Sequence, residues 1–139
     1  MFRHLRQVTV VLIGGIAMYS VKLPYSLLPV ELLRALGSSG LYKFQIAESL
    51  IVSTLVGYGM TRLLTWKWRV PAILAMPAFI LVWFPYQTSR QAREHFGPEY
   101  TFTRYFWNHF PYFSPYLIGA VLGVAAAVSV SKRKSLNAA

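Results

Sequence analysis

The stretch "LYKFQIAESLIVSTLVGYGMTRLL" (residues 41–64) is an almost continuous apolar block. A helix needs about 20 predominantly apolar residues to cross the hydrocarbon core of a bilayer, and this block supplies them. Because backbone amides find no water to bond in lipid, an isolated span of this kind must be helical. The stretch therefore predicts a transmembrane helix, in which Glu48 is an unusual intramembrane carboxylate.

Three further apolar blocks have the same character, although the last two are at the short end of the length that a span requires. No long polar segment separates the blocks, so a soluble domain is not expected. We predict an all-α integral membrane protein, a single four-helix domain covering residues 1–139. The predicted transmembrane helices cover about 5–23, 41–64, 70–86 and 115–130.

Two shorter segments carry the start signals of interfacial helices. In each, a proline suits the first helical position, and a glutamate follows where it complements the positive end of the helix dipole. Gly37 suits the C-terminal cap of the first segment, and Pro111 is expected to end the second. The predicted interfacial helices cover about 29–36 and 98–110.

The composition supports a membrane protein. The chain has 139 residues, of which 55% are hydrophobic and 13% are charged, whereas a soluble domain carries about 25% charged residues. The net charge is +10, but the basic residues flank the apolar blocks instead of lining one helix face. That placement indicates topology signals and lipid headgroup contacts, not nucleic-acid binding. The absence of cysteine excludes disulfides and thiolate chemistry.

The distribution of positive charge predicts the orientation. Eight basic residues fall on the side that holds both termini: Arg3, Arg6, Arg62, Lys67, Arg69, Lys132, Arg133 and Lys134. Five fall on the other side, where three glutamates offset them: Arg34, Lys43, Arg90, Arg93 and Arg104. The positive-inside rule therefore places both termini in the cytoplasm or the matrix.

The stretch "YTFTRYFWNHFPYFSPY" (residues 100–116) is dominated by aromatic side chains. Since Tyr and Trp collect at the headgroup level of membranes, we interpret it as an interfacial girdle. A quinone or lipid-headgroup site at Arg104 and His109, or a docking surface for a neighbouring subunit, are the alternatives. The residues expected at the interface or against lipid are Trp66, Lys67, Trp68, Arg69, Arg104, Tyr105, Trp107, His109, Lys132, Arg133 and Lys134.

Glu48 is expected to have a positively charged or hydrogen-bonding partner. A charge at the centre of a membrane helix costs about 2.5–3.5 kcal/mol on insertion scales. Lys22, near the outer end of the first span, is expected at a similar depth, so a Lys22–Glu48 pair would remove much of this cost. The alternatives are a contact with another subunit, a protonated acid, or a proton or cation site in a transporter.

Two spans carry small residues at helical spacing, which allow helices to approach closely in lipid. These ridges are expected to pack tightly within the bundle or against a partner. The residues are Ser49, Ser53 and Gly57 in the second span, and Gly119, Gly123 and Ala127 in the fourth.

Residue patterns for catalysis are missing. The chain has no aspartate and no paired carboxylates for acid–base work. His4, His95 and His109 fall outside the spans and lack the spacing of metal ligands. We therefore expect no enzyme, no metal and no resident cofactor, and we expect bound anionic phospholipid such as cardiolipin.

These observations favour a non-catalytic structural or accessory subunit of a larger membrane complex. An energy-transducing complex of the respiratory, photosynthetic or ATP synthase type would suit such a chain, in the mitochondrial inner membrane or the bacterial cytoplasmic membrane. Its partners would be other membrane subunits and anionic lipids, and it would act through helix packing and lipid contacts. The alternative is a small oligomeric transporter or lipid-carrier flippase that uses Glu48.

Overall fold

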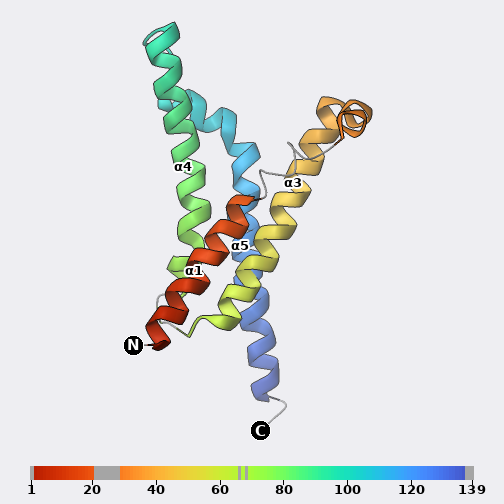
Figure 1. The fold of residues 1–139 in the computed structure, drawn as a ribbon, viewed down its shortest axis with the longest axis vertical. Helices are drawn as coiled ribbons and strands as arrows, with labels where there is room; N and C mark the ends of the chain where they lie inside the picture. Colours follow the sequence, from red (N-terminus) through yellow and green to blue (C-terminus); the bar gives the residue numbers. More distant parts are fainter. Residues whose placement is uncertain (1, 21–28, 66, 68, 137–139) are drawn as a thin grey trace.

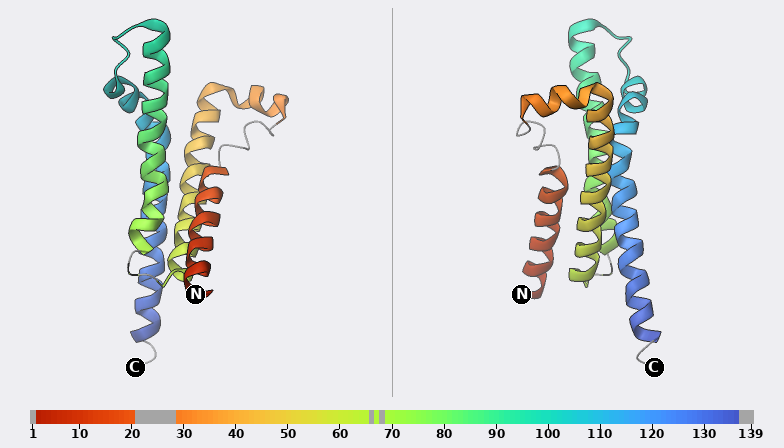
Figure 2. Two further views of the ribbon diagram at one scale, coloured as in Figure 1. Left: turned by 60° about the vertical axis from the view of Figure 1, so that its left-hand side comes forward. Right: turned by 90° about the vertical axis from the view of Figure 1, so that its right-hand side faces the viewer.

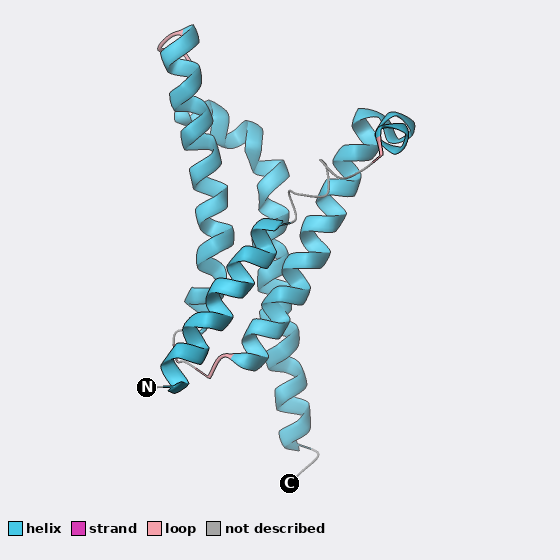
Figure 3. Ribbon diagram, in the orientation of Figure 1, coloured by secondary structure: helices cyan, strands magenta, loops and turns pink. Residues whose placement is uncertain are grey.

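The computed structural model describes residues 2–20, 29–65, 67 and 69–136, and within these ranges every regular element is an α-helix (Figure 3). The all-helical fold class is thereby confirmed. The helices are α1 (Phe2–Ser20), α3 (Val30–Leu63), α4 (Arg69–Phe96) and α5 (Phe102–Leu136). Among the described helices, two are long and apolar enough to cross a membrane, namely α4 and residues Phe102–Arg133 of α5. A topology with four crossings remains a prediction.

The helices are arranged around α5, which packs along both α3 and α4. α1 lies against α3 and, over a shorter length, against α4. Figures 1 and 2 show both chain ends and the connection between α3 and α4 at one end of the molecule. We call this the basic end, and we call the opposite end, where α4 leads into α5, the outer end.

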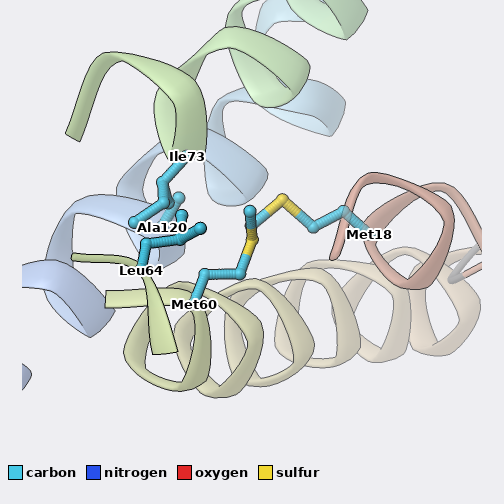
Figure 4. Packing of buried hydrophobic residues seen from close by; sticks show 5 residues of the cluster. All are labelled: Met18, Met60, Leu64, Ile73 and Ala120. Carbon is cyan, nitrogen blue, oxygen red and sulfur yellow. The ribbon is translucent and has the colours of Figure 1, made fainter. Parts of the chain in front are cut away.

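All four helices meet in one apolar cluster (Figure 4). Met18 of α1 points toward Met60 of α3, while Ile73 of α4 and Ala120 of α5 close the other side beside Leu64. Each of these side chains is buried. The cluster lies nearer the basic end than the outer end, so it is the basic half of the molecule that packs as a four-helix core.

Gly37 breaks α3 into two parts. Its backbone angles, φ 61° and ψ 178°, belong to a region that is essentially confined to glycine. Residues 30–36 therefore form a short arm that turns sharply away from the rest of α3 (Figure 2). Gly37 ends this arm, as its sequence signal indicates, whereas Pro29 is the N-cap and lies one residue before the first helical position that the sequence suggested for it.

α4 extends ten residues past the predicted end of the third span at residue 86. The extension, residues 87–96, is polar and carries an exposed ion pair between Arg90 and Glu94, with Nε and Oε1 3.0 Å apart. Gly97, with φ 124°, follows the helix end. Pro77 and Pro85 lie inside the helix with buried rings, so the missing backbone donors are accommodated where α4 packs on its neighbours.

The prediction of a separate interfacial helix at about 98–110 is wrong in both its limits. Residues 97–101 form a turn, and α5 begins at Phe102. Pro111 and Pro115 do not end the helix, which continues to Leu136. Each proline removes one backbone donor, but α5 is held by helices on two sides, and that packing outweighs the local penalty. The first turns of α5 instead run across the long axis before the helix turns to follow it (Figure 1).

Candidate functional site: the seam between α3 and α5

The backbones of α3 and α5 touch along a line of glycines. A Cβ atom added to Gly119 would lie 2.6 Å from the carbonyl oxygen of Leu50, and one added to Gly57 would lie 2.8 Å from that of Ala120. Gly123 makes an equally close approach to α3. Side chains larger than hydrogen are excluded here, so the glycines allow the two helices to reach van der Waals contact.

The structure brings the two predicted ridges together within one chain. Ser49 and Ser53 are fully buried against α5, and Ala127 is buried on the opposite helix. The Ser53 hydroxyl donates a hydrogen bond back to the carbonyl oxygen of Ser49, so it needs no acceptor on a neighbouring helix. Both ridges are therefore occupied by contacts within the chain, and they are not available to another protein.

Three buried oxygens at the outer part of this seam have no hydrogen-bond partner among the described residues. They are Oε2 of Glu48, Oγ of Ser49 and the hydroxyl of Tyr116. The Tyr116 hydroxyl is close enough to interact electrostatically with Ser49 and Glu48, although not in hydrogen-bonding geometry. An unsatisfied buried polar group costs about 1–3 kcal/mol. We call these three residues the polar cluster.

The polar cluster extends from the interior to the surface of the helix pair. Tyr116 and Ser49 have exposed fractions of 1% and 0%, whereas Glu48 is partly exposed. No other acid occurs between residues 32 and 93. Lys22, the predicted partner of Glu48, lies outside the described residues, so this pair stays a prediction. Sequence reasoning overlooked Tyr116, because its place in the aromatic stretch suggested the interface and not the core.

Arg104 and His109 have different surroundings. His109 lines a groove of about 470 Å³ together with Gln45 and Tyr112. Arg104 instead lies over the ring of Tyr100, 5.4 Å from its centroid. A quinone or headgroup site would need both side chains to face one ligand, and the structure directs them to different surroundings.

His109 is held by its own helix and by a neighbouring ring. Its Nδ1 atom lies 2.8 Å from the carbonyl oxygen of Tyr105, and its ring stacks on Phe113 with 5.9 Å between centroids. The Phe113 ring in turn stacks on Phe84 of α4 at 5.0 Å. These rings join α4 and α5, while Trp107 remains 62% exposed at the surface.

The predicted lipid-contact residues near the basic end come from three different helix ends. Arg69 and Lys132 line a pocket of about 320 Å³ together with Thr61 and Ser131. An N–H of Arg62 donates to the Ser131 hydroxyl over 3.0 Å. Lys67 and Arg133 are exposed, whereas Trp66, Trp68 and the side chain of Lys134 lie outside the described part of the chain.

Within the described residues, no group of three His, Asp or Glu side chains could hold a metal ion. The functional groups of the seam are a carboxylate and two hydroxyls, beside closely packed backbones.

Comparison with known protein families, with curated proteins and with solved structures finds no match to this chain.

Proposed function

We propose that the chain crosses a bilayer four times and serves as a non-catalytic accessory subunit of a larger membrane assembly of the energy-transducing kind. Two described helices, α4 and α5, have the length and composition of spans. A third, α3, contains most of the apolar block at residues 41–64 that predicts the second span. The connection between α3 and α4 lies at the same end as both termini (Figure 1). This end carries eight of the predicted topology signals, which the positive-inside rule assigns to the cytoplasm or matrix.

The exposed side chains of the helices are also better suited to contact with lipid or another protein than to contact with water. α1 exposes a row of large apolar side chains, including Leu12 and Ile16, both more than 60% exposed. Between α1 and α4 lies an apolar groove of about 390 Å³ that includes Met76 and Phe79. An apolar surface of this extent on a soluble monomer would be a liability, but it suits a hydrocarbon solvent or a neighbouring helix.

The observation that carries the accessory role is the position of Glu48. Glu48 lies at the predicted depth of a span. The residue is partly exposed, while its Oε2 atom is buried and has no hydrogen-bond partner among the described residues. A charge in this position costs several kcal/mol unless a donor meets it. Because the glycine seam is closed internally, we propose that a donor on a neighbouring subunit contacts Glu48.

Isolation of the tagged chain in mild detergent tests this role. We expect a defined set of other membrane subunits to co-purify with it. Glu48→Gln is expected to lose most of these subunits, while the matched control Glu94→Gln, on the polar extension of α4, retains them. Purification of the wild-type chain alone would contradict the accessory role. Equal retention by both variants would contradict the contact of a neighbouring subunit with Glu48.

A second candidate function rests on the polar cluster. The three oxygens of this cluster, which have no hydrogen-bond partner among the described residues, could bind a proton or a small cation in a transporter. Proteoliposomes that hold the purified chain and a pH-sensitive dye would show proton flux that Glu48→Gln abolishes and Glu94→Gln leaves intact. Absence of wild-type flux of protons, Na⁺ or K⁺ would remove this alternative.

A further inference from the structure

Three grooves follow one another along a single face of α4. The first is the apolar groove of about 390 Å³ between α1 and α4. Phe79 lines this groove and also a second one, of about 280 Å³. Tyr86 and Phe102 line both the second groove and a third, of about 420 Å³, at the outer end. Because neighbouring grooves share residues, the three form one continuous groove, which we call the α4 groove.

The residues of α4 that line the α4 groove recur at helical spacing, so they lie on one face of the helix. Six members of this row are Ala72, Met76, Phe79, Trp83, Tyr86 and Arg93. From Ala72 to Tyr86 the row covers about 21 Å, at 1.5 Å per residue. Half of the hydrocarbon core of a bilayer is only about 15 Å thick. A hydrocarbon chain that fills this length is therefore held extended.

The lower part of the α4 groove, toward the basic end, is apolar and accessible. Leu12 of α1 and Phe79 of α4 form its walls, and their side chains are 61% and 53% exposed. Met18 and Met60 are buried and close its floor (Figure 4). A guest molecule would therefore contact mainly the walls.

The middle of the α4 groove is aromatic, and its upper part is charged. The rings of Phe79, Trp83 and Tyr86 follow one another with 5.4 and 5.9 Å between centroids. Above them, Arg90 is held in its ion pair with Glu94, whereas Arg93 is exposed and forms no ion pair with any described residue. The N–H groups of a guanidinium match the oxygens of a phosphate.

We propose that the α4 groove binds one glycerophospholipid. Its phosphate lies beside Arg93 at the outer end, and one of its acyl chains extends past the aromatic rings into the space between α1 and α4. The proposal rests on the membrane placement given under the proposed function. It is carried by the change along the groove from a charged mouth to an apolar end, since this order matches the head and the tail of a lipid.

Other occupants fit the α4 groove less well. A helix is about 10 Å across, and because α1 lies against α4, it would lie over the lower groove and not enter it. A second copy of the chain has the same orientation in the membrane. Packing of α4 on its symmetry mate would therefore bring Arg93 beside the same residue of the partner, and like charges repel.

Native mass spectrometry of the purified full chain, in a mild non-ionic detergent, tests the site. The probe is dioleoylphosphatidylglycerol, and we expect the wild-type chain to retain one molecule of it. Leu12→Trp fills the lower part of the groove and should abolish this retention. Ile13→Trp is the matched control, because Ile13 is also 61% exposed but lines none of the three grooves. It should retain the lipid.

A second pair of variants fills the groove from the opposite wall. Ala75 lines the lower groove, whereas Ala78 is exposed outside it. Ala75→Trp should lose the lipid, and Ala78→Trp should retain it. Circular dichroism identifies any variant that does not fold. If the folded variants Leu12→Trp and Ala75→Trp retain the lipid as well as their controls do, the proposal is wrong.

The position of the phosphate has its own test. Arg93→Gln should lower the affinity for the phospholipid about five-fold, which is the effect of one basic residue near a membrane surface. Arg34→Gln removes the same charge from the short arm of α3 and should leave the affinity unchanged. Dioleoylglycerol, which lacks the phosphate, should bind more weakly and should not respond to Arg93→Gln. Equal binding of the two lipids would contradict a phosphate beside Arg93.

Failure of this proposal is distinguishable from failure of the proposed function. A wild-type chain that retains no lipid but forms a dimer, which Leu12→Trp dissociates, would show that a second copy covers the groove. A chain that retains the lipid as expected but co-purifies with no other subunit would contradict the accessory role and leave the lipid site in place. Solubility of the wild-type chain without detergent would contradict both.

Discussion

A methyl group placed on Gly57 would lie 2.8 Å from the carbonyl oxygen of Ala120, whereas one placed on Gly59, two residues further along the same helix, would meet no atom within 4 Å. The two glycines therefore have different roles. Gly57 allows α3 and α5 to touch, while Gly59 faces away from the contact. This pair gives a matched test of the seam.

Gly57→Ala is expected to destabilise the protein, because neither backbone can move without disturbing its own helix. Overpacking of this kind costs about 1–3 kcal/mol. Gly59→Ala should be neutral or stabilising by up to about 1 kcal/mol, since alanine favours a helix more than glycine does. Thermal unfolding in detergent, followed by circular dichroism, measures both. Equal melting temperatures would contradict the close contact of the seam.

The bend at Gly37 predicts a measurable distance. Val30 and Phe44 would lie about 21 Å apart in a straight helix, at 1.5 Å per residue. The chain contains no cysteine, so Val30→Cys and Phe44→Cys can be spin-labelled without background. We expect the labels to be closer than in a straight helix, and Gly37→Ala to lengthen their separation or to lower stability, because alanine disfavours a φ of 61°.

Ser39→Ala is the control for this measurement, since Ser39 is exposed two residues beyond the bend. It should change neither the distance nor the melting temperature. A wild-type distance equal to that of a straight helix would show that the arm continues the direction of α3.

The Tyr116 hydroxyl has no hydrogen-bond partner among the described residues, so its removal is expected to be harmless in the isolated chain. Tyr116→Phe should leave the free energy of unfolding unchanged or raise it by about 1 kcal/mol. Thr61→Val is the comparison, because the Thr61 hydroxyl donates to the Gly57 carbonyl over 2.7 Å, and its loss should be neutral or mildly destabilising. Chemical denaturation in mixed micelles distinguishes the two variants.

A strongly destabilising Tyr116→Phe would mean that Glu48, Ser49 or an ordered water does accept or donate at this hydroxyl. If Tyr116→Phe is stable but reduces co-purification of other subunits, the polar cluster serves assembly and not folding.

The proposed topology predicts the labelling of single cysteines by a membrane-impermeant maleimide. Arg3→Cys and Lys67→Cys should react from the same side of the membrane, and Gln91→Cys from the opposite side. Ile118→Cys should react from neither side, because this exposed position lies in the apolar part of α5. Labelling of Ile118→Cys by the aqueous reagent, or of Arg3→Cys and Lys67→Cys from opposite sides, would refute four crossings.

Several features could be read from the sequence because they depend on nearby residues. Long apolar blocks require helices, and the Gly37 signal depends on the conformational freedom of one residue. The small-residue ridges were likewise visible as regular spacings. What a spacing does not show is the identity of the opposing surface. The structure places Gly57 and Gly119 in the same seam, where a neighbouring subunit was an equally valid expectation.

The error at Pro111 has the same origin. A proline disfavours a helix locally, and residues 98–110 considered alone would end there. The structure continues α5 through both prolines, because α3 and α4 pack on it and stabilise it as a whole. Tertiary packing here outweighs the low helix propensity of proline, and a single sequence does not show which helices will pack on the segment.

The sequence by itself determined the helical class, the apolar blocks and the unequal distribution of charge, since each follows from composition over a short range. The tertiary structure alone decided that Tyr116 joins Glu48 and Ser49, and that Arg69 and Lys132 line one pocket. Tyr116 meets Glu48 and Ser49 because the glycine seam sets how closely and in which register α3 and α5 pack, and Arg69 meets Lys132 because α4 also packs along α5. Each pair is far apart along the chain, so the sequence alone did not show either contact.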